Sequence, residues 1–210
     1  MEDSLGMLET TGLTPALVAL DSMEKSADVR VLQAEVNDFL GVIIKLLGPI
    51  DAIQTALGLG LELAERMGGK PVSQCINRPD AGAWRAIESP AEFNPLIQQD
   101  VVTYPTYDSI SNQNLEEQTV AQSDALGFIE TQGFTAVFDA IDTACKAASV
   151  EVLGKEKLGG GYVTVVIRGD VAAVRAAVEA GRSRVDSLGN LIAAHVISKP
   201  SPSVLALLPK

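Results

Sequence analysis

The sequence predicts an α+β fold that is built twice. The chain repeats itself at a fixed interval, which indicates a duplicated unit. Each copy alternates short apolar runs with amphipathic helical segments, which predicts strands and helices in one mixed domain. Hydrophobic residues make up 47% of the chain but aromatic residues only 4%. A core of Ala, Val, Leu and Ile favours small helices packed closely on a sheet.

The repeat has an offset of 121 residues and contains no gap. Residues 3–10 reappear as residues 124–131, and Gly48 and Ile76 recur as Gly169 and Ile197. About 30% of the positions from 3 to 79 are identical in the second copy. The chain is therefore predicted to be a tandem array of two related domains.

The first half of each copy predicts a strand followed by a helix. Residues 5–9 form a short apolar run suited to a buried strand. Thr14 and Pro15 then predict a helix N-cap and a first helical position, and the helix extends to about Ser26. Both copies carry an apolar stripe at helical spacing, namely Ala16, Leu20 and Met23 in the first and Val137, Ile141 and Ala144 in the second.

Two strands and a second helix complete the prediction. Strands are expected at 29–32 and 42–47, and at 150–153 and 163–168 in the second copy. The helix starts after Gly48 or Gly169, and a last strand ends at Pro79 or Pro200. The order β-α-β-β-α-β is the split β-α-β, ferredoxin-like pattern. Local signals support the second helix in both copies. In the first copy, Pro49 suits the first helical position and Gly68 a C-cap. In the second copy, Asp170 suits an N-cap and Gly189 a C-cap, and Val171, Val174 and Val178 are expected to face inward.

The two copies define the expected domains. We predict a first domain over 1–87, a linker over 88–123 and a second domain over 124–210. The stretch between the copies contains Pro90, Pro95 and Pro105 and has no apolar period, which is typical of a linker or an ordered surface connection. Tyr104 and Tyr107 are expected to pack down on a domain, the alternative being a binding feature.

Charge and residue usage exclude several functions. The net charge of −11 argues against nucleic-acid and anionic-membrane partners. We expect a soluble, cytoplasmic chain, because no apolar run is long enough to span a membrane and no signal segment is recognisable. Cys75, Cys145 and the single histidine, His195, form no metal or nucleophile motif, so no metal, cofactor or enzymatic activity is predicted.

A glycine-rich stretch, residues 155–162, precedes a β-branched run. Gly159, Gly160 and Gly161 are consecutive, but no Gly-Lys-Ser/Thr follows them, and a strand rather than a helix comes next. The stretch therefore matches neither a Walker loop nor a dinucleotide-binding loop.

Several segments resemble the bacterial microcompartment shell domain. They are residues 126–131, Ala140, Asp142, residues 146–148, residues 163–171 and the closing residues 194–200. The first copy carries a weaker version in residues 5–10, 25–27, Gly48 and residues 76–79. The chain thus resembles a tandem-domain shell protein, and this resemblance covers nearly all of it except the linker and the extreme ends.

The resemblance implies a homotrimer in which six domains form a pseudohexagonal tile. Such tiles pack edge to edge with other shell proteins around encapsulated enzymes, and small metabolites pass through central pores. In this family the loop before the third strand lines the pore. The pore-lining residues would be Asp38, Phe39 and Leu40 in the first copy and Gly159, Gly160 and Gly161 in the second.

The implied pore would have threefold chemistry. Around a threefold axis, carboxylates of Asp38 about 8 Å apart would repel each other by about 0.5 kcal/mol per pair, which disfavours anions or favours a cation. Phe39 would narrow the opening, or simply pack. The three glycines would present backbone N–H groups to solutes, or only make a tight turn. Family members with an iron–sulfur cluster carry a cysteine in this loop, and this chain has none there.

Four basic residues match the tile edge of the family. Lys25 and Lys146 match its edge lysine, and Arg78 and Lys199 match the basic residue before the terminal proline. The alternative is that they are ordinary solvated charges. An alternative function is also open at this stage, because two ferredoxin-like domains can form a small-molecule-binding regulatory module.

Overall fold

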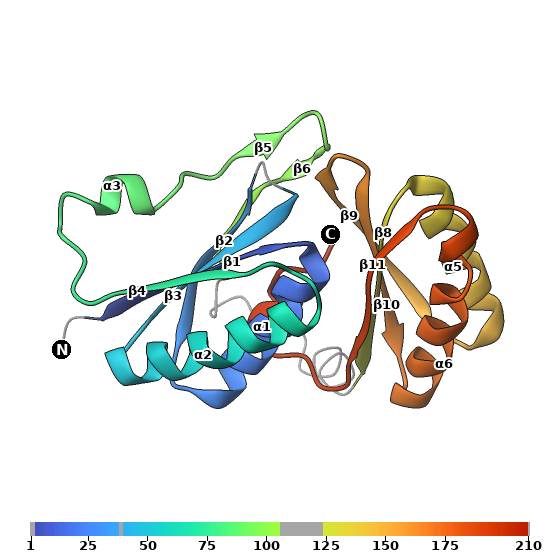
Figure 1. Cartoon of the computed structure of the whole chain (residues 1–210), viewed down its shortest axis with the longest axis horizontal. Helices are drawn as coiled ribbons and strands as arrows, with labels where there is room; N and C mark the ends of the chain where they lie inside the picture. Colours follow the sequence, from blue (N-terminus) through green and yellow to red (C-terminus); the bar gives the residue numbers. More distant parts are fainter. Residues whose placement is uncertain (1–2, 38–39, 106–123, 210) are drawn as a thin grey trace, which may run out of the picture. The chain divides into compact units, whose positions relative to one another are not determined.

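The protein folds as two compact units, Met1–Pro105 and Thr106–Lys210. The computed structural model describes residues 3–37, 40–105 and 124–209. Each unit is an antiparallel sheet with two main helices on one face (Figure 1). Within the part of the chain that is described, no helix is both long and apolar enough to cross a membrane.

The first unit contains one complete copy of the repeat. Its sheet has the strand order β4-β1-β3-β2-β7. The repeat elements are β1 (Ser4–Thr11), α1 (Leu13–Ser26), β2 (Arg30–Asn37), β3 (Gly41–Gly48), α2 (Ile50–Arg66) and β4 (Val72–Ile76). They are followed by α3 (Trp84–Ile87), β5 (Phe93–Asn94), β6 (Gln99–Asp100) and β7 (Val102–Thr103).

The second unit has the same arrangement without the added edge strand. Its elements are β8 (Ala125–Gln132), α5 (Phe134–Ala147), β9 (Glu151–Gly159), β10 (Tyr162–Gly169), α6 (Val171–Arg182), the 3₁₀ turn η2 (Val185–Ser187), β11 (Asn190–Ile197) and α7 (Pro202–Ala206). The strand order is β11-β8-β10-β9. The predicted ferredoxin-like order is confirmed in both units, since the fourth strand lies beside the first and the second strand beside the third.

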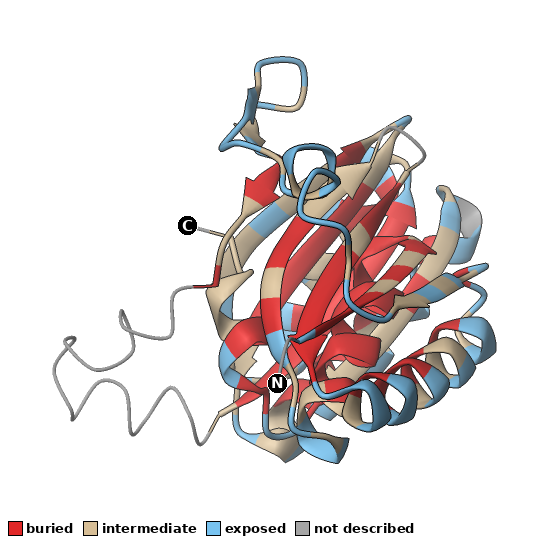
Figure 2. Ribbon diagram, turned by 90° about the vertical axis from the view of Figure 1, so that its left-hand side faces the viewer, coloured by how far each residue is buried: buried red, intermediate tan, exposed pale blue. Residues whose placement is uncertain are grey.

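The predicted apolar stripes form the cores. Ala16, Leu20 and Met23 have no exposed surface, and neither have Val137 and Ala144. Ile141 is partly buried against the core of the second unit. Figure 2 shows that buried positions concentrate on the strands, whereas the outer helix faces are exposed. Helical periodicity alone therefore identified the faces that pack on the sheets.

The starts of the first helices differ from the prediction. Thr14 is not an N-cap, because α1 begins at Leu13 and Gly12 precedes it with φ 87°. The second copy uses Gly133, with φ 128°, in the same way. Glycine adopts such angles without a Cβ clash, so the chain turns directly from strand to helix. Pro49 is likewise the N-cap residue of α2 rather than its first helical residue.

The ends of the second helices were predicted with mixed success. Asp170 is the predicted N-cap, since its carboxylate accepts a hydrogen bond of 2.8 Å from Ala172 N. Gly68, with φ 76°, follows the last turn of α2 as expected. Gly189 does not end α6, which stops at Arg182. Gly189 instead allows close packing, because a Cβ there would lie 2.8 Å from Gln132 O.

The second strand of each copy is longer than predicted. β2 and β9 continue to Asn37 and Gly159, so the charged residues 155–157 belong to a strand and not to a loop. Pairing with β3 and β10 supplies the backbone hydrogen bonds that a local pattern does not reveal. β9 lies at a sheet edge and contains two register shifts, where charged side chains are tolerated.

Candidate functional site

Each unit carries a hairpin tip where the resemblance predicts the pore. The tips join β2 to β3 and β9 to β10, and each is tied to the N-cap residue of the first helix of its unit, α1 or α5. Gly12 N donates to Leu40 O at 2.8 Å, and Gly133 N donates to Gly161 O at 2.9 Å. The two tips therefore occupy equivalent places in the two units.

The tip of the second unit is a tight glycine turn. Gly159, Gly160 and Gly161 have φ values of 85°, 53° and 83°. Gly159 pairs with Tyr162, which leaves Gly160 and Gly161 as the two central residues, a position that demands positive φ. Gln132 Nε2 donates to Gly160 O at 3.2 Å. The geometry explains why glycine is needed here, and the pore-lining role remains a prediction.

The tip of the first unit is braced by a side chain. Asp38 and Phe39 lie outside the described residues, and Leu40 adopts a φ of 64°. Asn37 Nδ2 donates to Glu9 Oε1 at 2.6 Å, and Gly41 N donates to Asn37 Oδ1 at 2.9 Å. Sequence reasoning missed this role of Asn37, although asparagine beside a turn is a recognisable signal.

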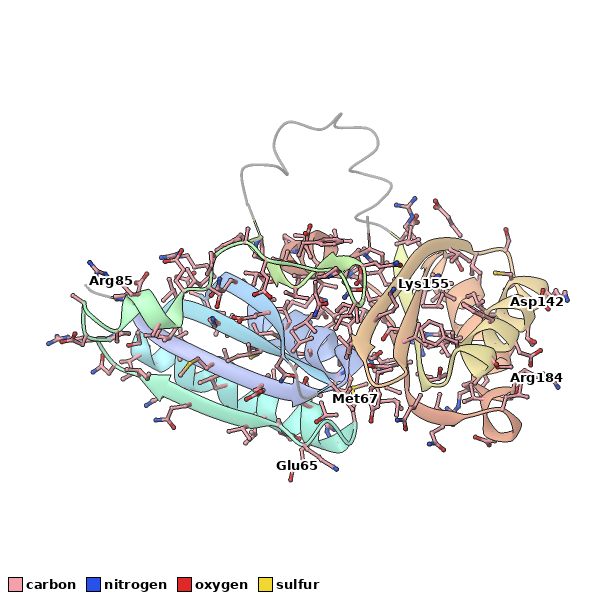
Figure 3. All side chains as sticks on the ribbon, turned by 90° about the horizontal axis from the view of Figure 1, so that it is seen from above. Glu65, Met67, Arg85, Asp142, Lys155 and Arg184 are labelled. Carbon is pink, nitrogen blue, oxygen red and sulfur yellow. The ribbon has the colours of Figure 1, made fainter. Side chains whose placement is uncertain are left out.

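The predicted edge lysines lie in the last turns of equivalent helices. Lys25 Nζ is 2.6 Å from Asp21 Oδ2 and Lys146 Nζ is 2.5 Å from Asp142 Oδ2. Figure 3 shows Asp142 on the outside of its unit. The other two predicted edge residues, Arg78 and Lys199, are exposed just after β4 and β11. All four are thus surface residues, which both the edge role and the solvated alternative require.

An exposed apolar face on the second unit was not foreseen. Phe134, Phe138 and Val152 are 40%, 48% and 46% exposed. The two phenyl rings lie 5.9 Å apart, and Lys155 Nζ lies 5.6 Å from the Phe138 ring centre. The equivalent residues of the first copy, Leu13, Leu17 and Val31, are only 7%, 1% and 3% exposed. Phe134, Phe138 and Val152 together are termed the α5 face.

Part of the predicted linker packs on the first unit. Ser89 N donates to Gln33 Oε1 at 3.0 Å, and Gln33 Nε2 donates to Ser89 O at 3.2 Å. The hydroxyl of Tyr104 donates to Ser89 O, which places Tyr104 on a domain as expected. Tyr107 lies outside the described residues. Residues 88–105 thus behave as an ordered surface connection, one of the two interpretations drawn from the sequence.

Two side chains have shifted pKa values. Burial raises the pKa of Glu156 to about 7, although nearby Lys157 lowers it. Burial also raises the pKa of the Cys75 thiol, which favours its protonated form. Among the described residues, no group of three or more His, Cys, Asp or Glu side chains is arranged to hold a metal ion.

Comparison with known proteins decides the family. The model of the BMC domain family matches residues 4–79 and residues 125–200. The chain belongs to the BMC domain family. Both matches coincide with the two copies of the repeat, so the tandem BMC-domain architecture inferred from the sequence is confirmed.

The related BMC-domain proteins are shell proteins by name. The bacterial microcompartment shell protein PduA of Citrobacter freundii is 47% identical over 89 residues, which are 42% of this chain and 96% of that protein. The carboxysome shell protein CsoS1 of Prochlorococcus marinus is 48% identical over 81 residues, 38% of this chain and 79% of that protein. A solved microcompartment protein from Desulfitobacterium hafniense aligns with 98% of this chain and 99% of its own, at 22% identity and a TM-score of 0.37.

Proposed function

We propose that this protein is a structural shell protein of a bacterial microcompartment. Three chains would form a ring of six BMC domains, a pseudohexagonal tile with a central pore for small metabolites. Support comes from the two BMC domains in one chain and from relatives that are named shell proteins. The chain would join other shell proteins edge to edge and would catalyse no reaction.

The main structural support for a trimer is the exposed α5 face. It exposes two adjacent phenyl rings on α5 and a valine on β9, whereas the equivalent positions of the first copy are buried. Clustered apolar surface of this kind marks protein contacts. A head-to-tail ring covers the same face on every chain, because each chain receives the next one at that place. A second copy of this chain is therefore the expected occupant.

The mass of the protein in solution tests this proposal. We expect a species of three chains, each of 22.0 kDa. Phe138→Asp should shift the mass towards the monomer, because it places a charge in the centre of the apolar face. Phe93→Ser is the matched control, since Phe93 is 58% exposed but lies on β5, and it should leave the trimer intact. A wild-type chain that stays monomeric at every concentration would contradict the proposal.

The pore would be lined by both hairpin tips in alternation. Gly159, Gly160 and Gly161 would present backbone groups, and Asp38, Phe39 and Leu40 would present side chains. Since the two tips differ in sequence where the flanking repeat agrees, the pore would have threefold rather than sixfold symmetry. Three carboxylates of Asp38 near the axis would disfavour anionic metabolites.

A further inference from the structure

Each unit has a glutamate at the same position of its second strand, but the two glutamates have different neighbours. Glu35 of β2 and Glu156 of β9 are equivalent in the repeat. In the first unit, Lys45 Nζ lies 2.8 Å from Glu35 Oε2, and Ser89 Oγ donates to the same oxygen at 2.9 Å. The first unit thus gives this carboxylate a cation and a hydroxyl.

Lys45 also fixes the segment that follows the first copy. The residue is 5% exposed. Its ammonium donates to Gln33 Oε1 at 2.7 Å and to Ile87 O at 2.6 Å. A buried ammonium requires such acceptors, because an unpaired charge in a desolvated place is costly. The chain around Ile87 and Ser89 is therefore held on the sheet by polar contacts.

In the second unit, the equivalent part of the sheet is covered by apolar rather than polar contacts. Val166 replaces Lys45 and has no exposed surface, and Gly154 replaces Gln33. A Cβ on Gly154 would lie 2.8 Å from Pro209 Cβ, so Pro209 packs directly on β9. Pro209 comes one repeat length after Glu88, next to Ser89. The ends of both copies therefore return to the same part of their sheets.

Glu156 keeps its carboxyl in this apolar version of the site. Thr164 lies directly opposite on β10, and its hydroxyl is buried without a hydrogen-bond partner among the described residues. Glu130 of β8 pairs with Thr164 and is fully buried on the same face. Lys157 is the adjacent residue of β9, and Lys155 lies over Phe138. The position from which Lys45 neutralises Glu35 is occupied here by a valine.

We propose that Glu156 is a proton-operated latch for the C-terminal segment of the second unit. With its carboxyl protonated, the residues around Pro209 stay docked on β9. Ionisation places a charge, which Lys157 offsets only in part, on the strand against which they pack, and it loosens the contact. The first unit has no such latch, because Lys45 compensates the equivalent carboxylate. This inference concerns one unit alone and stands independently of the trimer.

The direction of the effect follows from the raised pKa of Glu156. The folded state holds the proton more tightly than the unfolded chain, in which a glutamate titrates near its ordinary value of 4.5. The stabilising contribution is complete below about pH 4.5 and is lost as the pH rises through about 7. Docking of the C-terminal segment should therefore weaken between pH 6 and pH 8.

Hydrogen exchange measured by mass spectrometry on the full chain tests the latch. After correction for intrinsic exchange rates, protection of residues 150–158 and 201–209 should fall about three- to tenfold from pH 6 to pH 8. Residues 84–89 of the first unit serve as the internal control and should lose no comparable protection. Equal protection of residues 201–209 at both pH values overturns the proposal.

Two variants identify the titrating group. Glu156→Gln should abolish the pH dependence, because the amide is neutral throughout. Val166→Lys should restore protection at pH 8 by supplying the ammonium that Lys45 provides in the first unit. A pH dependence that persists in Glu156→Gln contradicts the latch. If Val166→Lys does not fold, the wild type and Glu156→Gln decide the question by themselves.

Discussion

Lys45 is a residue whose chemistry the sequence did not reveal. It sits in an apolar strand, Gly41–Gly48, and nothing in that pattern indicates where its charge goes. The structure shows three acceptors around its ammonium, from Gln33, Glu35 and Ile87. Two of these acceptors lie in β2 and the third ends α3, so the lysine ties the return segment to the sheet.

Lys45→Met should lower the free energy of unfolding of the first unit by about 1–3 kcal/mol, because it leaves partly buried acceptors without their cation. Arg66→Met removes an exposed ion pair to Glu62 and should cost less than about 1 kcal/mol. Urea denaturation measures both values. Equal losses in the two variants would show that the Lys45 network contributes nothing beyond a surface pair.

At the scale of elements, two glycines show how closely the helices approach their neighbours. Gly181 of α6 faces α5 and β8, where a Cβ would lie 2.8 Å from Ala140 O and 2.5 Å from Ile129 Cδ1. Gly58 of α2 has open space around it. Both occur in helices, where glycine is intrinsically unfavourable, so only the packing distinguishes them.

Gly181→Ala should destabilise the protein by about 1–3 kcal/mol, because a backbone oxygen has to move to admit the methyl group. Gly58→Ala should stabilise it by about 0.5–1 kcal/mol through helix propensity alone. Thermal unfolding of the two variants beside the wild type measures the difference. A stabilising Gly181→Ala would disprove the close approach of α6 to α5.

For the whole molecule, the proposed assembly uses two different surfaces. The α5 face is apolar and is proposed to close the trimer. The basic residues at the ends of α1, α5, β4 and β11 are charged and exposed, and they are proposed to join trimers into sheets. Because the two surfaces differ in chemistry, variants can separate the two steps of assembly.

Lys146→Ala should weaken sheet formation and leave the mass of the trimer unchanged, since Lys146 is 74% exposed and lies at the end of α5. Arg182→Ala is a suitable control, because Arg182 is 52% exposed in an ion pair on the adjacent helix α6 and has no proposed edge role. Electron microscopy shows the sheets and sedimentation gives the mass. Loss of the trimer in Lys146→Ala would contradict an edge role.

Much of the fold was predictable because its signals are local or periodic. The 121-residue repeat, the order of strands and helices and the buried stripes all follow from spacing along the chain. Asp170 and Gly68 were predictable because a cap depends on its own turn. Gly189 was misassigned because its neighbour, Gln132 O, lies far away in sequence.

For the candidate site, the sequence predicted where the residues lie in the chain but not the contacts of their side chains. The resemblance placed the pore residues and edge lysines, and the structure shows equivalent hairpin tips and helix ends at those places. The side-chain brace at Asn37 and the α5 face were missed. The brace depends on a contact between Asn37 and Glu9, which are distant in sequence, and the exposure of the α5 face depends on which segments pack against α5. Neither can be inferred from a single sequence.

The sequence by itself determined that this protein is a tandem pair of ferredoxin-like domains, because the duplication and the apolar periodicity depend only on the order of residues in the chain. Only the tertiary structure decided that residues 88–105 pack on the first unit, and that Glu35 forms a 2.8 Å ion pair with a buried lysine while a valine occupies that lysine's position near Glu156. The physical reason is that hydrogen bonding, burial and charge compensation are set by residues that meet in space. Equivalent positions in a repeat can therefore acquire different chemistry.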